Sequence, residues 1–137
     1  MIAEGLWDVP GVRVVMPDDA RVPSWYGLTL QYQPEELGGL PIERYFEALQ
    51  AEGCLEADRP GSTCPLNLLP LFQDPEDLFP GHVGGLGYRP GDFPKAETFH
   101  VCSIKLPVWH REEDLPLARQ YVEAFRKVST GYRSLLG

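Results

Sequence analysis

The sequence is poor in basic residues and in long apolar segments, and each shortage narrows the class of protein. No apolar run approaches the roughly 18 residues that cross a membrane, and neither end carries a lipidation signal. Only 12 basic residues stand against 20 acidic ones, and the net charge of −8 repels nucleic-acid phosphates and anionic membrane surfaces. We therefore expect neither a membrane nor a nucleic acid as partner, whereas a neutral or cationic ligand fits better.

Cysteine is also scarce. The chain has three cysteines, Cys54, Cys64 and Cys102, which is an odd number and too few for a disulfide framework. The first residues lack the basic region and the apolar stretch of a secretory signal. These features predict a cytoplasmic protein with reduced thiols.

Histidine and cysteine do not occur at the spacings of metal ligands. The sequence contains no CxxC, HxH or HExxH pattern, so we expect no metal site. A nucleophilic cysteine and histidine pair would have to be assembled by folding, with Cys64 beside His82 or His110. For His100 and Cys102 we expect ordinary roles, as a partly exposed imidazole and a packed thiol.

The composition is that of a globular domain. Apolar residues make up 43% and charged residues 23% of the chain, and 137 residues are enough for one core but too few for two. We therefore expect a single domain over residues 1–137. The 14 prolines and 14 glycines predict long, ordered loops.

Periodicity in the sequence predicts the order β-β-α-β-loop-α-β-α. Strands are indicated by β-branched runs and by alternation of apolar and polar residues, and they are expected over 12–16, 25–33, 54–57 and 103–106. Helices are indicated by apolar stripes and by capping residues, and they are expected over 40–52, over 93–101 and from Glu112 onward. Residues 66–72 are expected to be extended, with Pro70 barring them from a central strand.

This order predicts an α+β fold with a small, mostly antiparallel sheet and helices on one face. The last helix is the strongest prediction, because acidic residues precede it and its apolar residues recur at helical spacing. Its expected buried residues are Ala118, Tyr121, Val122, Phe125 and Val128.

Five segments occur in an order that points to a known family. They are the strand WYGLTLQY, the helix RYFEALQAEGC, the loop CPLNLLPLF, the segment GDFPKAE and the strand IKLPVW, followed by the acidic start of the last helix. Together they resemble the C-terminal small domain of the DegT/DnrJ/StrS family of sugar aminotransferases, which use pyridoxal phosphate (PLP) in the fold type I architecture. The resemblance covers about residues 11–128. The form of CPLNLLPLF is similar to that in the aminohydroxybenzoate synthase and inosose aminotransferase branch.

The resemblance implies a domain that does not transaminate alone. In family members a large domain carries the lysine that forms the Schiff base, the acid that pairs with the pyridine nitrogen and most of the phosphate contacts. This sequence contains none of those motifs, and Lys95, Lys105 and Lys127 lie in other segments. We therefore expect no catalytic or cofactor-binding residue in the chain, and PLP only together with a complementary large domain.

The resemblance also implies where substrate would lie. In family enzymes the loop that matches residues 63–72 borders the substrate pocket, so Cys64 and Asn67 are the candidates for residues near substrate. The alternative for Asn67 is a hydrogen bond to the backbone of its own loop. Asp92 is expected to cap the helix of the FPKAE segment, and Glu97 is expected to reach back within it.

Three functions remain open at this stage. The preferred one is the small domain of a PLP-dependent aminotransferase. A second is a stand-alone, non-catalytic binding or interaction module derived from that domain, and the third is a hydrolase built on a cysteine and a histidine. The expected partner is a large aminotransferase domain or a second copy of the chain, because the face evolved against a large domain would leave apolar residues exposed. In the second case, this face would hold a protein partner or a small metabolite.

Overall fold

The computed structural model describes residues 1–17, 22–61, 63–81 and 87–137. These residues form two compact units. One, which we call the sheet unit, comprises Met1–Arg59 and Cys102–Gly137, and the other, which we call the central unit, comprises Pro60–Val101. Two such units can belong to one domain, so the single domain over residues 1–137 stays a prediction.

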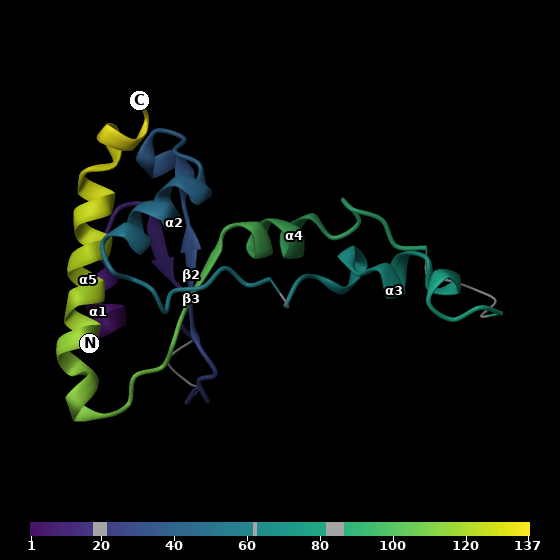
Figure 1. Ribbon diagram of the computed structural model, residues 1–137, viewed down its shortest axis with the longest axis horizontal. Helices are drawn as coiled ribbons and strands as arrows, with labels where there is room; N and C mark the ends of the chain where they lie inside the picture. Colours follow the sequence, from purple (N-terminus) through teal and green to yellow (C-terminus); the bar gives the residue numbers. More distant parts are fainter. Residues whose placement is uncertain (18–21, 62, 82–86) are drawn as a thin grey trace. The chain divides into compact units, whose positions relative to one another are not determined.

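The sheet unit contains a three-stranded antiparallel sheet (Figure 1). Its strands are β1 (Val12–Val14), β2 (Leu28–Tyr32) and β3 (Ser103–Leu106), in the order β1-β2-β3. Leu30 at the centre of β2 is paired with Val14 on one side and with Ile104 on the other. Three of the four expected strands are therefore confirmed, and two of them are shorter than expected.

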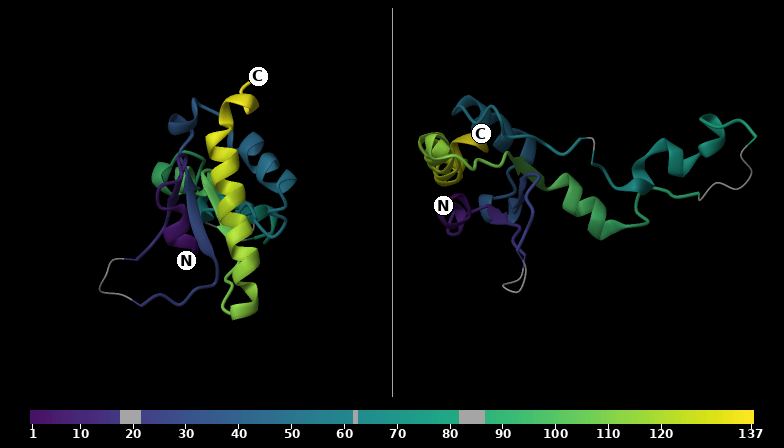
Figure 2. Two further views of the ribbon diagram at one scale, coloured as in Figure 1. Left: turned by 90° about the vertical axis from the view of Figure 1, so that its left-hand side faces the viewer. Right: turned by 90° about the horizontal axis from the view of Figure 1, so that it is seen from below.

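Helices cover one face of this sheet (Figure 2). They are α1 (Ile2–Leu6), α2 (Ile42–Ala51) and α5 (Leu115–Thr130). The side chains of Leu30 and Tyr32 on β2, and of Ile104 and Leu106 on β3, are buried in one cluster with residues of all three helices. The predicted α+β class, with an antiparallel sheet and helices on one face, is confirmed.

The centre of the core is aromatic. Tyr45 on α2 lies between Tyr32, with ring centroids 4.8 Å apart, and Phe125 on α5, with centroids 6.3 Å apart. The hydroxyl groups of Tyr45 and Ser129 form a buried hydrogen bond of 2.8 Å, which joins α2 to α5. Burial raises the pKa of Tyr45 well above its usual value, because a phenolate would be poorly solvated there. The apolar stripe predicted for the last helix faces this core, with only Val122 half-buried.

Helix α1 was not predicted. It packs against α5, and a Cβ atom at Gly5 would lie 2.9 Å from both γ carbons of Val122, so glycine permits the close approach. Arg126 on α5 donates to the carbonyl oxygen of Gly5 at 2.8 Å and pairs with Asp8 at 2.5 Å. These contacts join residues that are far apart in sequence. They stabilise a five-residue helix that is too short to be stable by itself.

The strand predicted over residues 54–57 is wrong, because this segment forms a turn after α2. Gly53 has φ = +96°, the left-handed conformation that ends a helix, and the N–H of Cys54 still donates to the carbonyl of Leu49. Pairing with the sheet begins only at Asp58, whose backbone N–H and carbonyl bond to those of Lys105 on β3.

The central unit consists of short helices. They are the 3-10 helices η2 (Leu66–Leu68) and η3 (Pro75–Asp77), and the α-helices α3 (Pro70–Gln73) and α4 (Pro94–Val101). The helix predicted over residues 93–101 is confirmed. The extended segment predicted over residues 66–72 is wrong, because Pro70 starts α3 at a position where its fixed φ suits the first turn and its missing N–H is not needed.

The central unit has almost no apolar core among its described residues. Only Asn67 and Pro75 are buried there. Seven large apolar side chains are exposed, namely Leu66, Leu71, Leu78, Phe79, Phe93, Phe99 and Val101. Polar contacts must therefore account for much of the local order of this unit.

No helix in the described parts of the chain is both long enough and apolar enough to span a bilayer.

Candidate functional site

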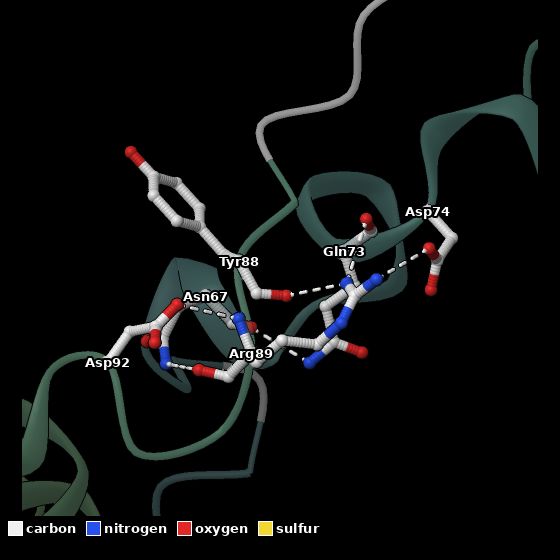
Figure 3. A network of polar contacts seen from close by, with 6 residues as sticks. All are labelled: Asn67, Gln73, Asp74, Tyr88, Arg89 and Asp92. Carbon is white, nitrogen blue, oxygen red and sulfur yellow. Dashed lines mark hydrogen bonds and ion pairs between the residues drawn. The ribbon is translucent and has the colours of Figure 1, made fainter.

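Asn67 is the centre of a polar network in the central unit (Figure 3). It lies in η2 and is only 2% exposed. Its side-chain nitrogen donates to Oε1 of Glu97 at 2.7 Å and to the carbonyl oxygen of Arg89 at 3.3 Å. Its own carbonyl oxygen accepts a bond of 2.8 Å from the side-chain nitrogen of Gln73 on α3. Asn67 thus ties together three segments of the unit.

Glu97 caps the start of its own helix, α4. Its carboxylate accepts hydrogen bonds from the backbone N–H groups of Gly91 at 2.9 Å and of Phe93 at 3.3 Å. The bond from Gly91, together with those from Asn67 and Phe93, lowers the pKa of Glu97, because each stabilises the ionised carboxylate. The prediction that Glu97 reaches back within its helix is confirmed.

Arg89 extends the network toward α3 (Figure 3). Its guanidinium donates to the carbonyl oxygens of Gln73 at 3.2 Å and of Tyr88 at 2.9 Å, and it pairs with Asp74 at 3.2 Å. Its backbone N–H donates to Oδ2 of Asp92 at 2.8 Å. The hydrogen bond of Asp92 thus closes the turn before α4, and Glu97 accepts from the N–H groups of Gly91 and Phe93, which directly precede this helix. The capping role expected for Asp92 stays a prediction.

The two predicted substrate-adjacent residues lie in different surroundings. The side-chain nitrogen of Asn67 donates to Glu97 and to the backbone carbonyl of Arg89, which lies outside the loop of Asn67 itself. Cys64 is half-buried with a free thiol, and it lies outside the network among the described contacts. Their position next to a substrate stays a prediction. Arg89 and Gln73 were missed, and only the turn sequence YRPGD around Arg89 could have indicated an ordered loop.

The described residues contain no group of three or more histidine, cysteine or acidic side chains that could hold a metal ion. Cys54 is buried, and burial raises the pKa of its thiol to about 11, so it is not a thiolate at neutral pH. The predicted pair of Cys64 with His82 is not tested, because His82 lies outside the described residues. The pair of Cys64 with His110 stays a prediction too, because the two residues belong to different units. His100 is half-buried on α4, and Cys102 is half-buried just after it, in keeping with ordinary roles.

Two of the three lysines are paired with carboxylates, and the third is exposed. Lys105 pairs with Asp58 at 3.0 Å, and this hydrogen bond raises its pKa and keeps it charged. Lys127 pairs with Glu52 at 2.5 Å, and Lys95 is exposed on α4. A lysine that holds PLP needs a neutral amine, which ion pairs with carboxylates oppose. That the chain holds no PLP by itself stays a prediction.

Comparison with known proteins gives no match to any protein-family model, and no curated protein matches the sequence.

Replacing Glu97 with alanine is expected to loosen the loop around Gly91 and Phe93. The N–H groups of these two residues lose a charged acceptor, so their protection from hydrogen exchange should fall by about 3- to 10-fold at pH 7. A matched control is Glu76→Ala, an equal change of charge within η3 of the same unit. Unchanged protection in the Glu97 variant would show that the carboxylate does not hold the loop.

The same carboxylate makes this protection depend on pH. Because the pKa of Glu97 is lower in the folded unit than in an unfolded chain, its contribution is complete above the unfolded value of about 4.3 and is lost as pH falls through the folded value. Protection factors at Gly91 should therefore fall below about pH 4 in the wild type. In the Glu97→Ala variant they should not show this step.

Proposed function

We propose that this chain acts as the small domain of a DegT/DnrJ/StrS-type, PLP-dependent aminotransferase, in the cytoplasm, and that it depends on a large domain for catalysis. One contact carries the proposal. Asn67, from the segment CPLNLLPLF, donates to Glu97, from the segment GDFPKAE, at 2.7 Å. Two of the five segments on which the resemblance rests are thus joined by a buried asparagine, as expected if they form one functional surface.

The exposed apolar side chains of the central unit support a need for a partner. A unit whose described part buries only Asn67 and Pro75 gains little from the hydrophobic effect by itself. Leu78 and Phe79 are 55% and 58% exposed and follow each other directly, after the acidic pair Glu76 and Asp77. A large domain that covers this surface would supply the missing burial.

In such a complex PLP would supply the electron sink for transamination, while the lysine that binds it would come from the large domain. This chain would contribute the surface around Cys64 and Asn67. The network of Asn67, Glu97 and Arg89 would hold that surface in a fixed shape before substrate arrives, which lowers the cost of ordering it on binding.

The test is assembly with large domains of this family. PLP-loaded large domains from the aminohydroxybenzoate synthase and inosose aminotransferase branches, lacking their own small domains, are mixed with the chain. We expect a one-to-one complex in sedimentation velocity and a gain of transaminase activity with an amino donor. The variant Asn67→Leu should weaken both, whereas Glu123→Gln on the exposed side of α5 should weaken neither. Failure of every large domain to bind or gain activity would overturn the proposal and favour a stand-alone binding module.

The isolated chain is expected to show no saturable imine with PLP at neutral pH. Its lysines are exposed or paired with carboxylates, and a protonated amine forms only weak, reversible imines. Absorbance titration followed by dialysis measures this directly. A one-to-one imine that survives dialysis and disappears with a single change among Lys95→Ala, Lys105→Ala and Lys127→Ala would contradict the prediction, because the chain would then build its own cofactor site.

A further inference from the structure

A pocket of about 310 Å³ lies in the sheet unit, and none of its lining residues belongs to the polar network around Asn67. It is bounded by α1, by the start of β2 and by the segment that leads from β3 into α5. This volume is at the lower end of the range for small-molecule sites, and it has room for a ligand of two fused rings.

The walls of this pocket are apolar and partly aromatic. They include the side chains of Trp25, Trp109, Met16, Leu28 and Leu115. Trp109 is held in place by an edge-on contact with Tyr121, with ring centroids 4.7 Å apart. Met16, Trp25 and Leu115 are between 38% and 49% exposed, so a ligand would remove apolar surface from water. Flat indole rings favour an aromatic ligand, which can stack on them or meet them edge-on.

Arg111 supplies a positive charge to the lining of the pocket. Its guanidinium pairs with the carboxylate of Glu113 at 4.0 Å, and both side chains are largely exposed, so this pair is weak. Two other charged groups line the pocket: the carboxylate of Asp114, which accepts from the backbone N–H of Arg111, and the amino group of Met1, which pairs with Glu4. A guanidinium binds a carboxylate through two parallel hydrogen bonds.

We propose that this pocket binds a small aromatic carboxylate, with its rings between Trp25 and Trp109 and its carboxylate on Arg111. The net charge of −8 opposes an anion only at long range, because salt screens charges beyond about 8 Å at physiological ionic strength. The preference for a carboxylate ligand therefore depends on the guanidinium of Arg111, which lines the pocket itself. This site does not depend on a large domain, so its test is independent of the proposed function.

The test uses two probes of equal shape, 2-naphthoate and the neutral 2-naphthamide, followed through the indole N–H resonances of the three tryptophans. We expect saturable shifts at Trp25 and Trp109 with both probes, and tighter binding of the carboxylate. Trp7, which is 79% exposed and does not line the pocket, should not shift and serves as an internal control.

Two variants distinguish the effect of the positive charge on binding from the effect of the shape of the pocket. Arg111→Gln should weaken the binding of 2-naphthoate by about 10-fold and leave the affinity for 2-naphthamide unchanged. The control Arg44→Gln removes the same charge from α2, outside the pocket, and should change neither affinity. Ala3→Leu, which places a larger side chain in the lining of the pocket, should weaken the binding of both probes.

Three results would overturn the proposal. One is the lack of any saturable shift at Trp25 and Trp109. Another is equal affinity of the wild type and Arg111→Gln for 2-naphthoate. The third is a shift of both resonances with protein concentration in the absence of a probe, which would assign the pocket to a second copy of the chain.

Discussion

Replacing Phe125 with alanine is expected to lower the free energy of unfolding by about 3–5 kcal/mol. The phenylalanine is fully buried on α5, where its ring meets that of Tyr45 edge-on. Alanine would leave a cavity between α2, α5 and the sheet that the surrounding rings cannot fill without moving. Chemical denaturation of both proteins measures the loss from the midpoint and the slope.

The control for this prediction is Phe79→Ala in the central unit. Its side chain is 58% exposed, so the same change of residue type removes little burial, and we expect a loss of less than about 1 kcal/mol. A loss below about 1 kcal/mol for Phe125→Ala would mean that α5 does not present this face to the core. Equal losses of unfolding free energy for the two variants would mean that the side chain of Phe79 is buried in the folded chain.

Replacing Gly11 with alanine is expected to destabilise the chain on a similar scale, by about 2–5 kcal/mol. Two effects add. Gly11 has φ = +81°, which costs a residue with a Cβ atom about 1–2 kcal/mol. The new Cβ would also lie 2.4 Å from Cδ1 of Leu37, which is fully buried and cannot move aside without disturbing the core, and such overpacking costs about 1–3 kcal/mol.

Gly39 offers a control that isolates the first effect. It has a similar backbone conformation, with φ = +79°, but nothing lies within 4 Å of the position that a Cβ atom would take there. Gly39→Ala should therefore cost only the backbone term of about 1–2 kcal/mol. The difference between the two variants, measured by thermal and urea denaturation, gives the cost of the contact with Leu37. If the two losses are equal, Leu37 relaxes freely and the steric argument is wrong.

Elements with strong periodicity were predictable from the sequence. Helices α2 and α5 carry apolar stripes, and β3 ends at a proline, so local pattern and tertiary packing agree at these places. Two errors were local, because Gly53 ends α2 in a turn and Pro70 starts a helix, whereas the missed helix α1 depends on long-range contacts. The helical state of Ile2–Leu6 depends on Val122 and Arg126, more than 100 residues away, and no local signal marks it.

The candidate site was predictable only in part. The spacing of Glu97 from the start of its helix indicates a cap, and the structure shows that cap. The bond between Asn67 and Glu97 spans 30 positions, and those of Arg89 to Gln73 and Asp74 span 16 and 15. No periodicity or motif encodes such pairings, because they depend on how loops of irregular conformation meet. The role of Cys64 and Asn67 beside a substrate remains a prediction from the resemblance.

The backbone bridge between Asp58 and Lys105 has a consequence for protein engineering. Two hydrogen bonds, of 2.9 and 2.7 Å, join the chain just before residue 60 to the chain just after residue 101. The sheet unit is therefore closed at its own boundary, and a short glycine linker between Arg59 and Cys102 would span no more than a hairpin does. We therefore expect the sheet unit to keep its fold when residues 60–101 are replaced by such a linker.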